Sequence, residues 1–71
     1  MENRVEELRR QRRLSQEAFA KAIQVSRQTV SSIENGRYNP SLDLAFTIAD
    51  FFGLPVEDIF LHERSAFNEK K

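Results

Sequence analysis

The chain has 71 residues, no cysteine, one histidine and a formal net charge of zero. A chain of this length forms one domain with a small core, and its composition excludes a disulfide framework and a cysteine or multi-histidine metal site, so we expect no cofactor. No apolar run is long enough to span a bilayer and the first residues lack the apolar stretch of a secretion signal, so we expect a cytoplasmic protein with no membrane partner.

The charge is unevenly distributed along the chain. Residues 1–40 carry eight cations and five anions, a net +3, whereas residues 41–71 carry three cations and six anions, a net −3. Affinity for nucleic acid comes largely from neutralising phosphates, so a neutral total does not by itself favour such a partner. The excess of cations in the first half does favour one, although mixed charge is also ordinary on a small protein surface.

The first predicted helix runs from Asn3 to Arg12. Asn3 followed by Glu6 resembles a capping box, and Val5 and Leu8 supply the apolar stripe that faces the core.

Two short helices are predicted between Ser15 and Gly36. Ser15 and Ser26 each precede a run with helical spacing, and a serine hydroxyl can accept a hydrogen bond from an unpaired N–H of the first turn. The distance between the two starts is about the length of a helix-turn-helix unit. Apolar residues occupy one face of each helix, with one more in the turn: Phe19, Ala20 and Ile23, then Val25, then Val30 and Ile33.

The second of these helices has a polar face opposite its apolar one. A rotation of about 100° per residue places Arg27, Gln28, Ser31 and Ser32 on that face, with no carboxylate among them. Arginine can bond to guanine, glutamine to adenine and serine to either. The face is therefore a candidate for reading base edges, the alternative for four polar residues taken alone being an ordinary solvated surface.

Gly36 ends this helix, and Ser41 begins the next, which is predicted over Leu42 to Phe52 and ends at Gly53. The expected inward stripe of that helix is Leu42, Ala45, Ile48, Ala49 and Phe52. In the loop before it, Arg37, Tyr38 and Asn39 can all donate hydrogen bonds, so we predict that the loop contacts phosphates. An exposed turn without a partner is the alternative.

The last predicted helix starts at Leu54-Pro55, because proline suits the first turn, and Val56, Ile59 and Phe60 complete the core. Four further apolar residues exceed what a small bundle needs: Phe46, Phe51, Leu61 and Phe67. We predict that they form the interface of a symmetric homodimer, a monomer being the alternative. The domain is expected over residues 1–61, followed by a tail, 62–71, that is either disordered or part of the dimer interface.

Several segments together resemble the Cro and phage-repressor-like helix-turn-helix family, also called xenobiotic-response-element-like regulators. The resemblance covers about Asn3 to Leu61, and its most specific part is the run from Ser26 to Arg37; the matching segments are Leu14-Ser15-Gln16, Ala20, Val25-Ser26, Gln28-Thr29-Val30 and Ile33-Glu34-Asn35-Gly36-Arg37. It implies an all-α fold, a compact bundle of about five helices of the lambda-repressor-like type. It also implies binding to operator DNA as a two-fold dimer.

Together with the rotation and the side-chain chemistry above, the resemblance gives roles to single residues. Base reading falls to Arg27, Gln28, Ser31 and Ser32, and phosphate contact to Gln16, Thr29, Asn35, Arg37, Tyr38, Asn39 and Ser41. Arg9 and Glu34 are expected to form a partly buried ion pair, and the helical rotation agrees, since it places Glu34 at the edge of the buried face. Arg13 and Gln24 stand where family members usually have glycine. If the backbone is left-handed there, each costs roughly 1 kcal/mol.

The predicted function is sequence-specific binding of double-stranded DNA by a small transcriptional regulator, a repressor, that acts as a homodimer with its third helix in the major groove. The alternative is a protein-interaction module, such as an antitoxin, that uses the same bundle to hold a protein partner. An enzyme is the least supported class, because the neighbouring carboxylates Glu6 with Glu7 and Asp43 with Asp50 are better explained as solvated helix faces. No small-molecule ligand is indicated.

Overall fold

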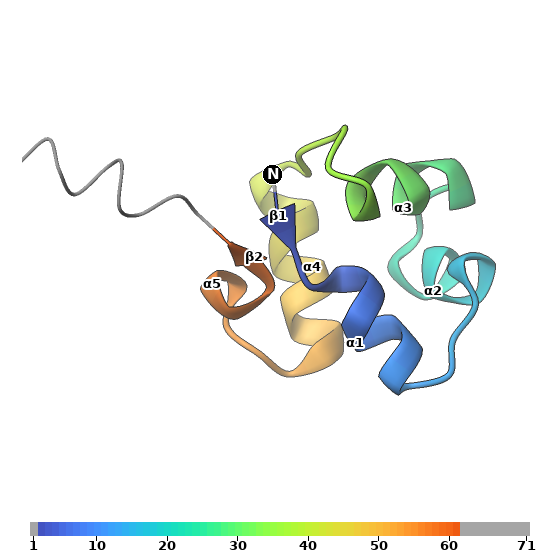
Figure 1. The fold of residues 1–71 in the computed structure, drawn as a ribbon, viewed down its shortest axis with the longest axis horizontal. Coiled ribbons are helices and arrows are strands. Elements are labelled where there is room, and N and C mark those ends of the chain that lie inside the picture. Colours follow the sequence, from blue (N-terminus) through green and yellow to red (C-terminus); the bar gives the residue numbers. More distant parts are fainter. Residues whose placement is uncertain (1, 62–71) are drawn as a thin grey trace, which may run out of the picture.

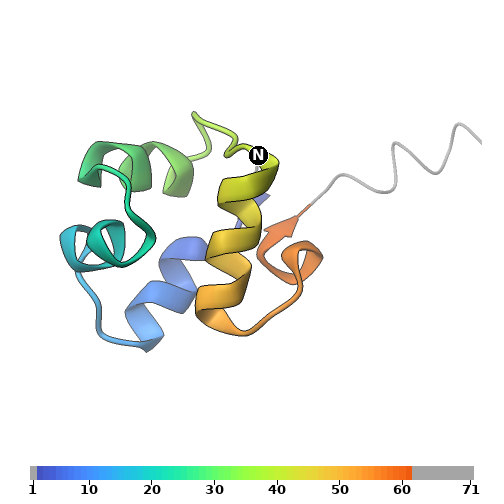
Figure 2. The same ribbon diagram turned by 180° about the vertical axis from the view of Figure 1, so that it is seen from behind.

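The computed structural model describes residues 2–61, which form a small helical bundle closed by a two-stranded sheet (Figure 1). In chain order the elements are β1 (Glu2–Asn3), α1 (Val5–Gln11), α2 (Gln16–Ile23), α3 (Arg27–Glu34), α4 (Leu42–Phe52), α5 (Val56–Ile59) and β2 (Phe60–Leu61). Helix α4 runs through the middle of the bundle, with α2 and α3 on one side and α5 and β2 on the other (Figure 2). Among these helices none is long and apolar enough to cross a membrane.

Three helices start at the serines that the sequence indicated. Ser15, Ser26 and Ser41 have extended backbone, and the Oγ of each accepts a hydrogen bond from the N–H three residues later, at 3.0, 3.1 and 3.2 Å. Each bond satisfies an N–H group that has no partner within its own helix. The predicted starts of α2, α3 and α4 are therefore confirmed.

A single apolar cluster holds the bundle together. Its buried members come from all five helices and β2: Val5, Leu8, Phe19, Ala20, Ile23, Val30, Ile33, Ala45, Ile48, Ala49, Phe52, Ile59 and Phe60. The Phe19 ring is fully buried and is stacked on Phe52, with 5.3 Å between ring centroids. Burial of one face of each short helix is what stabilises these helices, because helices of this length are marginal alone in water.

The start of the chain differs from the prediction. Asn3 is not the N-cap residue of α1; it belongs to β1 and pairs antiparallel with Phe60 of β2. Helix α1 begins two residues later, and its N-cap residue, Arg4, makes no side-chain capping bond. The predicted capping box is therefore wrong, and the reason is that pairing with the distant β2 segment holds Asn3 in extended backbone. Its side chain still accepts from the Val5 N–H at 3.0 Å and also donates to the Ile33 carbonyl at 2.8 Å.

Two residues of the second half that were predicted to lie in the core are not buried there. Leu42 is 67% exposed, because it lies about 70° around α4 from the centre of the buried stripe, at the stripe's edge. Val56 is only partly buried and packs against the margin of the core. Phe60 is buried as expected, but in β2 and not in the last helix.

Candidate nucleic-acid interface

The outer side of α3 carries the four side chains predicted to read bases. Arg27 and Gln28 are exposed and Ser31 and Ser32 partly exposed, whereas the two apolar residues on the opposite side of α3 are each 1% exposed. None of the four is packed into the core of the described residues. This face therefore presents a guanidinium, an amide and two hydroxyls to whatever approaches α3.

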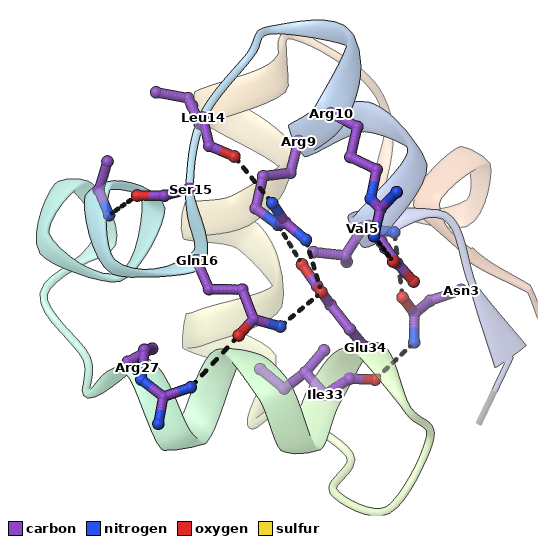
Figure 3. A network of polar contacts seen from close by, with 12 residues as sticks. Asn3, Val5, Arg9, Arg10, Leu14, Ser15, Gln16, Arg27, Ile33 and Glu34 are labelled. Atoms are coloured by element: carbon purple, nitrogen blue, oxygen red, sulfur yellow. Dashed lines mark hydrogen bonds and ion pairs between the residues drawn. The ribbon is translucent and has the colours of Figure 1, made fainter.

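The only carboxylate of α3 is turned away from this face and held by Arg9 of α1 (Figure 3). The Arg9 Nε donates to Glu34 Oε2 at 2.6 Å and its Nη2 donates to Glu34 Oε1 at 3.1 Å, while its Nη1 donates to the Leu14 carbonyl at 2.7 Å. The two side chains are 9% and 4% exposed. This is the ion pair that the resemblance implied. The hydrogen bond to Glu34 raises the pKa of Arg9 above its ordinary value.

Gln16, the first residue of α2, connects Glu34 at the end of α3 to Arg27 at its start. Its Nε2 donates to Glu34 Oε1 at 3.0 Å, and its Oε1 accepts from the Arg27 guanidinium at 3.4 Å. Both ends of the amide are thus engaged within the protein (Figure 3). Sequence reasoning assigned this side chain to a phosphate and missed the bridge, because the partners come together only through the packing of α2 against α3.

An open surface pocket of about 240 Å³ lies between the base-reading face and the loop that follows α3. Its lining residues are Ser26, Gln28, Thr29, Ser32 and Tyr38. The Thr29 hydroxyl is turned toward the cap, 2.9 Å from the Ser26 hydroxyl. Tyr38 is 46% exposed, so its ring and hydroxyl extend the polar surface of α3 beyond the end of the helix.

The loop between α3 and α4 is folded back on the end of α3. Gly36 has φ 82°, in the left-handed region that favours glycine. The N–H groups of Arg37 and Tyr38 both donate to the Ser32 carbonyl, at 3.0 and 3.1 Å, and the Arg37 N–H also donates to Asn35 Oδ1 at 3.0 Å. These bonds fix the loop at the end of α3, and the side chains of Arg37, Tyr38 and Asn39 are exposed. Ser41, by contrast, uses its hydroxyl to cap α4.

Arg13 and Gln24 both have left-handed backbone, the conformation whose cost at these positions was set out from the sequence. Their φ angles are 59° and 63°, and Gln24 ends α2 as its C-cap residue. Both side chains are exposed. Because neither residue is glycine, the left-handed backbone strains both turns.

Among the residues predicted for a dimer interface, Phe46 and Leu61 are 51% and 38% exposed. Leu42 lies one turn from Phe46 on α4 and extends the same apolar surface, although the sequence had placed it in the core. Phe51 is less exposed than these residues. It is partly buried, edge-on to Phe19 with 5.3 Å between centroids, so its ring belongs to the margin of the core. Phe67 lies outside the described residues.

No group of three or more His, Cys, Asp or Glu side chains within residues 2–61 could hold a metal ion.

Comparison with known protein families gives a match to the helix-turn-helix family over residues 5–59. An uncharacterized HTH-type transcriptional regulator from Methanocaldococcus jannaschii is 52% identical over 63 residues, covering 89% of this chain and 96% of that protein. The immunity repressor protein of Bacillus phage phi105 is 31% identical over 74 residues, covering 96% of this chain; the chain spans about half of that repressor, 51% of its length.

Among solved structures, the restriction-modification controller protein C.AhdI from Aeromonas hydrophila is similar to this chain with a TM-score of 0.72. The two are 32% identical, and the match covers 80% of this chain and 86% of the controller protein. The helix-turn-helix family match, residues 5–59, contains α2 and α3.

Proposed function

Because this chain belongs to the Cro and phage-repressor-like family of helix-turn-helix transcriptional regulators, which bind DNA and are not enzymes, we propose that it is a homodimeric repressor that reads a specific operator with α3. The observation that carries the proposal is the outer face of α3, which is polar, open and free of carboxylate because Arg9 holds Glu34 away from it. A face of this kind can enter the major groove without repelling the phosphates on either side.

In this proposal Arg27, Gln28, Ser31 and Ser32 contact base edges. Arg27 suits guanine, whose N7 and O6 both accept, and Gln28 suits adenine, which presents one acceptor and one donor. The two serines lie on the same outer face, and their side chains extend less far from the helix than those of Arg27 and Gln28.

Phosphate contacts on both flanks would set the angle of α3 in the groove. On one flank we assign the exposed residues Arg37, Tyr38 and Asn39 of the loop after α3, with Thr29, Asn35 and the main chain of Ser41. On the other flank we assign the first turn of α2 at Gln16, where main-chain N–H groups suit an anion.

Two such domains are needed to read a two-fold operator, with half-sites about 34–36 Å apart. We propose that the exposed apolar residues Leu42, Phe46 and Leu61 contribute to the interface of that homodimer. Residues 1–61 would form the DNA-binding domain, and residues 62–71 a separate tail.

The same exposed apolar surface also suits the second candidate, a module that holds a protein partner. Selection of bound sequences from random duplex DNA separates the two. We expect a palindromic motif whose binding weakens steeply with salt. Enrichment of no sequence at low salt, together with capture of a protein partner at high salt, would contradict the regulator proposal.

A further inference from the structure

The first strand, β1, connects the end of the base-reading helix with the surface proposed for the dimer. Asn3 of β1 donates from its Nδ2 to the Ile33 carbonyl, in the last turn of α3, at 2.8 Å (Figure 3). The neighbouring residue Glu2 pairs with Leu61 of β2, and Leu61 is one of the exposed apolar residues assigned to the dimer interface. One short segment therefore contacts both the helix that would meet DNA and the strand that would meet the second subunit.

The Asn3 amide is oriented by the backbone around it. Main-chain pairing with β2 holds Asn3 extended, and the Arg4 N–H continues this pairing by donating to the Ile59 carbonyl at 2.8 Å. The Asn3 Oδ1 accepts from the Val5 N–H at 3.0 Å. Because the amide oxygen faces an N–H group, the amide NH₂ is directed to the Ile33 carbonyl, and the reversed amide would lose both bonds.

A second contact at this end of α3, the Arg9–Glu34 ion pair, leads to α1. The exposed apolar residues assigned to the interface lie instead on α4 and β2: Leu42, Phe46 and Leu61. The ion pair therefore stabilises α3 within the bundle. The Asn3 bond, in contrast, connects α3 with the side of the bundle that would face the second subunit.

A two-fold operator requires a fixed arrangement of the two α3 helices, one from each subunit. One extra base pair between the half-sites moves them apart by about 3.4 Å and rotates one half-site by about 35° around the DNA axis. A dimer can follow that change only if α3 shifts relative to the dimer interface. A bond between β1 and α3 opposes such a shift.

We propose that Asn3 is a positioning residue for operator geometry: its bond to the Ile33 carbonyl holds α3 in place relative to the dimer interface, and the protein thereby discriminates between half-site spacings. The proposal rests on the dimeric DNA-binding function proposed above and adds to it a residue that contacts neither a base nor a phosphate. The size of the effect is limited by the bond itself, because an operator with the wrong spacing can at most break it. The net free energy of one hydrogen bond corresponds to a factor of about two to ten in affinity.

The test compares Asn3→Asp with the wild type. Aspartate keeps the oxygen that accepts from the Val5 N–H, but its second oxygen can only accept and would face the Ile33 carbonyl. Arg12→Met is the matched control, because the Arg12 Nη2 donates to the Phe52 carbonyl at 3.2 Å and so joins the end of α1 to the end of α4 without involving α3. An operator is first selected from random duplex DNA with the wild type. Dissociation constants are then measured on operators whose half-site spacing is one base pair shorter, unchanged or one base pair longer.

We expect Asn3→Asp to reduce the spacing penalty, which is the ratio of the dissociation constants on the altered and the selected operator, by about two- to tenfold. The added charge weakens binding to all three operators alike, so it cancels in this ratio. Base preferences within each half-site should stay at the wild-type level, and Arg12→Met should leave the spacing penalty unchanged even if it lowers the melting temperature. Asn3→Ala, which removes the bond without adding a charge, should act in the same direction as Asn3→Asp. Circular dichroism at the assay temperature establishes that each variant is folded.

Other results would overturn the proposal. If both Asn3 variants kept the wild-type spacing penalty, the bond would stabilise the fold without setting the arrangement of α3. An equal reduction of the penalty by Arg12→Met would show that any loosening of the bundle has this effect. A changed base preference within the half-sites, with the spacing penalty intact, would assign Asn3 to base reading.

Failure of the function proposed above gives different results. A wild type that enriches no duplex sequence has no specific DNA-binding function. A wild type that selects a single half-site, and that has the mass of one chain when bound to it, is not a two-fold dimer on DNA. Either result would remove the basis for a spacing role before any Asn3 variant is measured.

Discussion

The Arg9 Nε and the Glu34 Oε2 lie 2.6 Å apart and join the first helix to the last residue of α3. The contact has two consequences. It fixes the C-terminal end of α3 against the bundle, and it removes the one carboxylate of α3 from the surface that would meet DNA. A structural ion pair thus contributes to the electrostatics of the base-reading face.

Glu34→Ala should lower the free energy of unfolding by about 3–5 kcal/mol, because it leaves the Arg9 guanidinium buried without its partner. Glu6→Ala is the control, since the Arg10–Glu6 pair at 2.7 Å is largely exposed and should change stability by less than about 1 kcal/mol. Urea denaturation followed by circular dichroism measures both. Equal stability of Glu34→Ala and the wild type would contradict the structural role of the pair.

Gln24→Gly and Arg13→Gly should each raise the melting temperature by a few degrees. Glycine removes a left-handed strain of about 1 kcal/mol, offset in part by its greater freedom in the unfolded chain.

Gly53→Ala tests the same effect in reverse. Its φ is 69° and no atom lies within 4 Å of an added Cβ, so the expected loss of about 1 kcal/mol would be backbone strain alone. If Gln24→Gly and Arg13→Gly both lowered the melting temperature, the turns at these two positions would not be strained.

Gln28→Ala and Arg37→Ala should weaken DNA binding in different ways. Gln28 lies on the base-reading face, so its loss should cost about 1–3 kcal/mol on the selected operator and relax one position. Arg37 lies in the flanking loop, so its loss should weaken all sequences alike and reduce the salt slope by about one. Titrations at several salt concentrations on operator and unrelated DNA distinguish the two patterns. An equal loss on every sequence for Gln28→Ala would remove its base-reading role.

Phe46→Ser should weaken the homodimer by about two orders of magnitude or more, since a two-fold interface loses the same ring from both subunits. Phe51→Ser should act differently. Its ring packs against Phe19, so its loss should lower the melting temperature more than it changes dimerisation. Sedimentation equilibrium at micromolar concentration, with and without operator DNA, gives the association constants. A wild-type mass of one chain under both conditions would refute the dimer.

Local pattern was sufficient to predict most helices and the buried sides of α2 and α3. Ser15, Ser26 and Ser41 act on N–H groups three residues away, and apolar side chains at helical spacing find a common face whatever lies opposite. The polar face of α3 followed from the same rotation. These properties depend on residues that are neighbours along the chain, so the sequence by itself determined them.

Contacts between distant segments decided the rest. Asn3 became a strand residue because it meets Phe60, and its amide reaches Ile33, which lies 30 residues away. Gln16 became a bridge because Glu34, 18 residues later, is turned toward it by Arg9. A polar side chain bonds to the nearest suitable partner in space, and only the packing of the helices against one another determines which partner that is.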